Sequence, residues 1–221
     1  TKNGRTLVGI PYGRKKIAIS DKCTAVSTKS YWYGIETQWK WGEIIFPNTI
    51  TKVIDEWNGE FFDYGYTDDT HAGNKKEIKV ILNMKYLDRD SIKNLWQSNS
   101  RWRNSLKDEL IRKGLAKLNE ENERMLMLDD GYLCAYLMKD ISKIDDRSAW
   151  ETIDGLVVPD NVKTIGTEAF TGFLVKSLTF GSGVKYVEEN VLLAADVPNT
   201  YKNMATIYVK NHDIVISKKA F

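Results

Sequence analysis

Short apolar runs alternate with turn-forming residues along much of the chain, and the pattern is clearest over residues 156–170. The apolar run at its start ends at Pro159, as a strand leaving a sheet would. Asp160 and Asn161 then supply turn chemistry, because their short polar side chains can hydrogen-bond the nearby backbone. The pattern predicts a compact unit in which a strand, a turn and a second short strand follow one another.

This unit recurs later in the chain at two fixed offsets. A shift of 22 residues places Leu156 on Leu178, and a shift of 51 residues places it on Ile207. The apolar positions of the three copies are Leu156, Val158, Val162, Ile165 and Phe170, then Leu178, Val184, Val187 and Leu192, then Ile207, Val209, Ile216 and Phe221. A recurring apolar pattern of this length predicts a repeat architecture.

Weaker copies of the unit precede it at residues 17–27 and 44–54, and a further strand is predicted at 78–82. The aligned pairs include Pro47 with Pro159, Val53 with Ile165 and Cys23 with Val162. Cys23 is therefore expected to be a buried thiol. Because one unit cannot cover its own apolar face, neighbouring copies are expected to stack and form a continuous core.

The stretch between the two groups of copies does not follow the pattern. A short capped helix is predicted from Asp90 and Ser91, followed by the apolar residues Ile92, Leu95 and Trp96. A longer helix is predicted from about residue 104 to 122, with one apolar stripe formed by Leu106, Leu110, Leu115 and Leu118. Residues 125–137 are predicted to form two strands around an Asp-Asp-Gly turn.

Residues 156–170 match, nearly throughout, the pattern Ile/Val-x-Ile-Pro-x-x-Val-x-x-Ile-Gly-x-x-Ala-Phe, which resembles the repeat of the BspA-like leucine-rich repeat proteins. The resemblance is specific over 156–192, weaker over 4–27 and 44–57, and absent over about 84–125. Proteins of that family are typically bacterial surface or secreted proteins with a non-catalytic role in adhesion or protein binding. The resemblance therefore implies that role, and a secreted or cell-surface location.

With the resemblance, the elements predict an α/β repeat fold: a leucine-rich-repeat-like solenoid of short strands and turns with a helical insertion in the middle. We expect amino-terminal degenerate repeats over 1–83, the helical insertion over 84–125 and carboxy-terminal repeats over 126–221, all within one continuous solenoid. If the chain is complete as given, a cytoplasmic location is expected instead, because no export signal is visible.

Neither the composition nor the cysteine and histidine positions indicate an enzyme. The net charge of +2 gives no overall attraction to nucleic acid or anionic membrane, and no apolar run is long enough to span a bilayer. Cys23 and Cys134 are too few for a disulfide framework or a structural zinc site. His71 and His212 lie near no catalytic motif. We therefore expect no enzyme activity, no cofactor and no metal site.

Aromatic residues between and after the first two copies are candidates for a binding surface. They are Tyr31, Trp32, Tyr33, Trp39, Trp41, Tyr64 and Tyr66. Large amphipathic rings in loops suit protein binding, since tyrosine and tryptophan bring contact area at little cost in entropy. They could equally fill the core and close the end of the repeats, or stack on sugar rings. All three interpretations are open from the sequence.

Basic residues around the longer predicted helix are a third candidate feature. They are Arg101, Arg103, Lys107, Arg112, Lys113 and Lys117, with Trp96 and Trp102 nearby. Such clusters occur in nucleic-acid-binding proteins. However, acidic residues interleave with them at helical pairing distances, as they would on a solvated helix face. Nucleic-acid binding is therefore not expected.

The sequence favours a non-catalytic module that binds a protein partner through its strand face and aromatic loops. The alternative from another class is an intracellular effector or inhibitor, carried by a mobile element, in which the inserted helix acts and the repeats are a scaffold. A carbohydrate-binding or carbohydrate-acting protein is a third possibility, since sugar rings stack on the same aromatic side chains.

Overall fold

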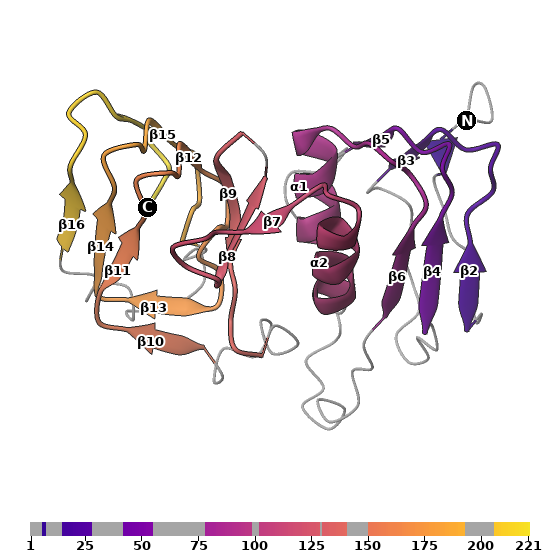
Figure 1. Cartoon of the computed structure of the whole chain (residues 1–221), viewed down its shortest axis with the longest axis horizontal. Coiled ribbons are helices and arrows are strands. Elements are labelled where there is room, and N and C mark those ends of the chain that lie inside the picture. The colour runs from indigo at the N-terminus through magenta and orange to yellow at the C-terminus, as the bar shows by residue number, and fades with distance from the viewer. Residues whose placement is uncertain are drawn as a thin grey trace. The chain divides into compact units, whose positions relative to one another are not determined.

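The structure is a computed structural model that describes residues 6–7, 15–27, 42–54, 78–98, 102–128, 130–140, 150–192 and 206–221. These residues fall into two units, the first within Thr1–Leu115 and the second within Ala116–Phe221. The described parts are mixed α/β, with mostly short strands in several small sheets and two helices (Figure 1).

The strands of the first unit form two parallel sheets of three strands each. One sheet has the order β1 (Thr6–Leu7), β3 (Ala25–Ser27), β5 (Lys52–Ile54), and the other has the order β2 (Lys16–Ala18), β4 (Glu43–Phe46), β6 (Lys79–Leu82). Ile17 lies opposite Ile44, and Val26 lies opposite Val53. The two weaker copies therefore pair in the register in which their sequences align.

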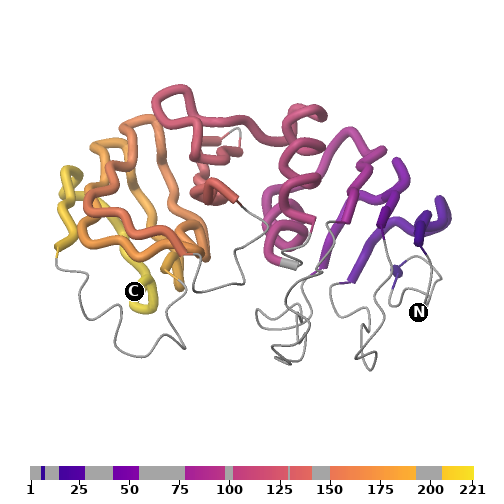
Figure 2. The backbone as a smooth tube through the Cα atoms, turned by 90° about the horizontal axis from the view of Figure 1, so that it is seen from below, coloured from indigo at the N-terminus to yellow at the C-terminus, as the bar shows by residue number. Residues whose placement is uncertain are grey.

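Parallel pairing also organises the second unit. One sheet has the order β11 (Leu156–Val158), β14 (Ser177–Phe180), β16 (Thr206–Val209), and β10 (Glu151–Ile153) pairs with β13 (Phe173–Val175). A third sheet has the order β17 (Val215–Ile216), β15 (Tyr186–Val187), β12 (Thr164–Ile165), β9 (Tyr132–Tyr136), β8 (Met125–Leu128), β7 (Lys117–Leu118). In Figure 2, the described turns of this unit from residue 150 onward run side by side, coloured from orange to yellow.

The repeat offsets found in the sequence are the pairing offsets of these strands. Leu156 lies opposite Leu178, and Leu178 lies opposite Ile207. In the third sheet, the same two steps lead from Ile165 to Val187 and on to Ile216. Each apolar position therefore sits directly above its counterpart in the preceding turn, which is how a parallel stack buries a shared core.

Most of the predicted repeat positions are buried. The fully buried ones are Val53, Leu156, Val158, Pro159, Val162, Ile165, Phe170, Leu178, Val184, Val187 and Leu192. Pro47 and Ile207 are partly buried, whereas Val209, Ile216 and Phe221 of the third copy are exposed. Cys23 is buried, as predicted, and so is Cys134, and neither forms a disulfide bond. The third copy thus keeps the register but not the burial.

The short predicted helix is present as α1 (Arg89–Ser98), but its cap is Asp88 and not the Asp90-Ser91 pair. The Oδ1 atom of Asp88 accepts a 2.8 Å hydrogen bond from the backbone N–H of Ser91, as an N-cap residue does. Hydrogen bonds from the Ser91 hydroxyl and N–H, together with the charge of Lys52, hold the pKa of Asp88 below its ordinary value.

Replacing Asp88 with asparagine should therefore make stability less dependent on pH. A lowered carboxyl pKa contributes stability above the ordinary aspartate pKa of about 4, and this contribution is lost as the pH falls through the folded-state value. Asparagine keeps the cap without the charge. Urea unfolding should show the variant to be less stable near pH 7 and closer to the wild type near pH 3. A constant difference at both pH values would contradict this.

The longer predicted helix is wrong in its second half. Helix α2 runs from Arg103 to Arg112 and does not continue to residue 122. Gly114 has a φ of 67°, and its N–H bonds the carbonyl of Ile111 while that of Leu115 bonds Leu110. This left-handed glycine closes the helix and turns the chain out of it. Two strands follow, β7 and then β8, and β8 forms the predicted hairpin with β9.

Candidate binding surface

Helix α1 closes the edge of one sheet of the first unit. Strand β5 is the last strand of its sheet, and its backbone at Val53 faces α1 instead of another strand. The Val53 N–H donates to the Ser91 hydroxyl at 2.9 Å, and the Asn94 side-chain amide donates to the Val53 carbonyl at 3.0 Å. The two side chains therefore make the hydrogen bonds that a neighbouring strand would make.

Helix α2 closes the other sheet in the same way. The Val80 N–H of β6 donates to the Ser105 hydroxyl at 2.8 Å, and that hydroxyl also lies 3.3 Å from the Val80 carbonyl. The Leu82 N–H donates to the Glu109 carboxylate at 2.9 Å. The hydrogen bonds from the Arg112 side chain have the largest effect in holding the pKa of Glu109 below its ordinary value. The hydrogen bond from the Leu82 N–H lowers this pKa further. We call β5 and β6, covered by these helices, the capped edge.

The corresponding edge of the second unit is not covered in this way. Strands β16 and β17 are each the last strand of their sheet, and no other described strand pairs with their outer sides. We call these two strands, with the turn up to Phe221, the open edge. Figure 1 shows β16 at the outer end of its sheet, beside β14.

The two edges differ in how much of their inward-facing side chains is exposed to solvent. Val209 is 36% exposed, although Phe180, its partner on β14, is fully buried. Ile216 is 38% exposed, whereas Val187, its partner on β15, is 3% exposed. At the capped edge, Val53 is buried to 2% exposure because a helix lies over it. Val209 and Ile216 are therefore core positions that the described residues leave partly uncovered.

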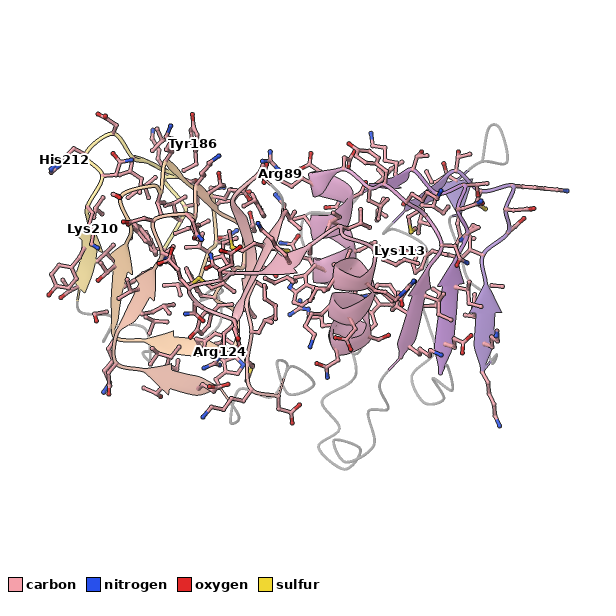
Figure 3. The ribbon with its side chains drawn as sticks, viewed as in Figure 1. Arg89, Lys113, Arg124, Tyr186, Lys210 and His212 are labelled. Carbon is pink, nitrogen blue, oxygen red and sulfur yellow. The ribbon has the colours of Figure 1, made fainter. Side chains whose placement is uncertain are left out.

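Further apolar and basic side chains surround these positions. Tyr208 and Val215 are exposed on the same strands, and the half-exposed ring of Phe221 stacks on Phe180 with centroids 6.5 Å apart. The exposed lysines of the last turn are Lys210, Lys218 and Lys219. Figure 3 shows Lys210 and His212 at this end of the unit, with His212 directed outward, as expected for a turn residue. Both strands of the open edge thus expose apolar side chains, and exposed lysines lie in the same stretch of chain.

Comparison with family models, with curated proteins and with solved structures finds no match to this chain. Inferences about function therefore depend on the geometry of the described residues. Within those residues, no group of three histidine, cysteine, aspartate or glutamate side chains is placed to hold a metal ion. Their helices also include none that is long and apolar enough to cross a membrane.

The aromatic residues proposed for binding from the sequence lie outside the described residues. They are Tyr31, Trp32, Tyr33, Trp39, Trp41, Tyr64 and Tyr66. His71 lies there as well. Their assignment stays a prediction, and among the described residues the open edge is the candidate binding surface.

Two of the basic residues near α2, Arg103 and Arg112, have partners in the fold, and Arg101 lies outside the described residues. The guanidinium of Arg103 donates to the Trp96 carbonyl at 3.0 Å and lies 5.7 Å from the centre of the Trp96 ring. Trp102 is buried, and its indole N–H donates to the carbonyl of Leu95. Arg112 pairs with Glu109 at 2.8 Å. Because both tryptophans are buried, neither ring can stack on a nucleic-acid base.

Arg124 stabilises the region around the first strands of the second unit. Its Nε atom donates to the Leu137 carbonyl at 2.8 Å, and its Nη2 atom lies 2.9 Å from both carboxylate oxygens of Glu151. The guanidinium also lies 4.8 Å from the Tyr136 ring centre and 5.3 Å from that of Phe173 (Figure 3). Arg124 is therefore a structural residue, and no sequence motif indicates this role.

Replacing Arg124 with methionine should lower the free energy of unfolding by about 2 kcal/mol, because partly buried charged hydrogen bonds are lost and Glu151 loses its partner. The matched control is Lys176→Met, which breaks an ion pair to Asp154 between two well-exposed side chains. That control should change stability by less than about 0.5 kcal/mol. Equal urea midpoints for the two variants would rule out the structural role of Arg124.

Proposed function

We propose that the protein is a non-catalytic protein-binding module built as a short leucine-rich-repeat-like solenoid. The parallel strands and their constant register support the repeat part of the proposal, because stacked turns of this kind share one core. The likeness of residues 156–170 to the BspA-like repeat supports it from the sequence side. An adhesion role at a bacterial cell surface is part of the same proposal.

One observation carries the binding proposal: Val209 and Ile216 occupy core positions and yet are more than one third exposed. Apolar side chains at such positions are covered in every preceding turn that pairs with them. Contiguous exposed apolar residues with a polar rim are typical of protein-binding surfaces. We infer that a partner protein covers the open edge.

The alternative in which a helix is the working part has less support. The inward side chains of α1 and α2 bond the strand backbone, and Leu106 and Leu110 of α2 are buried. A helix that closes a sheet edge in this way has a structural role. We therefore assign binding to the open edge and assign the two helices to the fold.

Affinity capture followed by mass spectrometry tests the proposal with a matched pair of variants. Ile216 and Ile111 have nearly equal exposure, 38% and 37%, but Ile111 lies on α2 in the first unit. The wild type and Ile111→Ser should retain the same partner, whereas Val209→Ser/Ile216→Ser should lose it while its circular dichroism spectrum shows that it stays folded. Retention by all three proteins would place binding elsewhere. Turnover of a glycan substrate would contradict the non-catalytic part.

A further inference from the structure

The kind of partner can be inferred from how the same chain closes its other sheet edge. At the capped edge, each covering element is an amphipathic helix whose serine, asparagine or glutamate side chains bond the strand backbone. Its apolar residues, such as Leu106 and Leu110, cover the buried strand positions. The open edge presents the same kind of parallel strand and the same kind of apolar position.

The charges at the open edge distinguish between possible occupants. Residues 206–221 contain the three lysines Lys210, Lys218 and Lys219 and one acidic residue, Asp213. The preceding turn carries exposed Lys185 together with Glu188 and Glu189, so the excess of positive charge lies in residues 206–221. Two copies meeting through this edge would bring like charges together, which disfavours self-association. An acidic partner surface would complement it.

We propose that the open edge binds an acidic amphipathic helix of a partner protein. The helix covers Val209, Ile216 and Phe221 with an apolar stripe and presents serine, threonine or asparagine to the outer backbone of β16 and β17. Its carboxylates lie near Lys210, Lys218 and Lys219. This inference rests on the proposed protein-binding function and specifies the partner's chemistry, using a mode of recognition in which a helix supplies regularly spaced apolar anchors.

Three synthetic helical peptides of about 20 residues provide the probes. All three have one leucine stripe flanked by serine and asparagine, and their remaining positions are glutamate, glutamine or lysine. Fluorescence anisotropy at low salt should show the glutamate peptide binding the whole chain at least about tenfold more tightly than the lysine peptide. The difference should shrink as salt is added. Equal affinities, or no binding of the glutamate peptide, would overturn the proposal.

Two sets of variants locate the binding. The substitutions Val209→Ser/Ile216→Ser should abolish binding of the glutamate peptide, and Ile111→Ser should leave it unchanged. The charge variant Lys218→Glu/Lys219→Glu changes exposed side chains and should reverse the order of the glutamate and lysine peptides. Its control, Lys15→Glu/Lys22→Glu, makes the same charge change at exposed residues of the first unit. An equal effect of both charge variants would contradict binding at the open edge.

Two outcomes separate this inference from the proposed function. Capture of a partner that depends on the open edge, without competition by the glutamate peptide, would leave protein binding in place and overturn the acidic helix. Sedimentation that shows a dimer of the wild type, lost in Val209→Ser/Ile216→Ser, would overturn it in favour of a second copy of the chain.

Discussion

Replacing Gly183 with alanine is expected to lower the free energy of unfolding by about 3 kcal/mol, because a β-carbon at this position has no space. An ideal Cβ on Gly183 would lie 1.8 Å from the carbonyl oxygen of Asp160. That oxygen belongs to the backbone of the preceding turn and cannot move aside as a flexible side chain could. The adjacent Ser182 N–H donates to the Asp160 carboxylate at 2.7 Å, which fixes the two turns together.

The control for Gly183 is Gly155→Ala, where the nearest heavy atom to the new Cβ is the Ser177 hydroxyl oxygen at 3.3 Å. Because neither glycine has a positive φ, backbone strain does not confuse the comparison. Gly155→Ala should cost less than about 1 kcal/mol. The measurement is urea unfolding followed by circular dichroism. Equal stability of the two variants would contradict the close stacking of turns in the second unit.

Removing the two serine hydroxyls at the capped edge is the second change with a large expected effect. Ser91→Ala leaves the N–H of buried Val53 without its partner, and Ser105→Ala does the same at Val80. An unsatisfied buried donor costs about 1–3 kcal/mol. Because the serines contact different strands, the losses should add, giving roughly 2–6 kcal/mol for the double variant.

The control for the serine variants is Thr51→Ala, which removes an exposed hydroxyl that bonds the Thr24 carbonyl at 3.3 Å in the same unit. Its effect on the free energy of unfolding should stay within about 0.5 kcal/mol. Urea unfolding of the wild type, the two single serine variants, the double variant and Thr51→Ala measures the effect. If the double serine variant were no less stable than Thr51→Ala, the helices would not be closing the sheets.

The repeat register could be predicted from the sequence because it depends on local patterns. Strand residues such as Leu156 and Leu178 alternate with turn residues in each copy, so matching apolar positions also identifies the strands that pair. Burial of the third copy could not be predicted in this way. Whether Val209 or Ile216 is buried depends on what packs against their outer side, and the apolar pattern within one copy does not contain that information.

The capped edge was missed because its residues resemble ordinary polar helix residues. Ser91 and Asn94 stand three apart, and Ser105 and Glu109 stand four apart, so each pair lies on one helix face. Small hydrogen-bonding side chains with this spacing beside a leucine stripe are the signal that could have indicated a cap. The predicted helix over 104–122 is too long because the apolar stripe continues past Gly114, whose left-handed backbone ends α2.

Hydrogen exchange of backbone amides tests most directly whether one edge is capped and the other open. In the free chain, the amides of Val53, Val80 and Leu82 should exchange slowly, because each bonds a helix side chain. The amides on the outer side of β16 and β17 should exchange at least about tenfold faster and become protected when the glutamate peptide is added. Equally slow exchange at both edges of a monomeric chain would contradict the account.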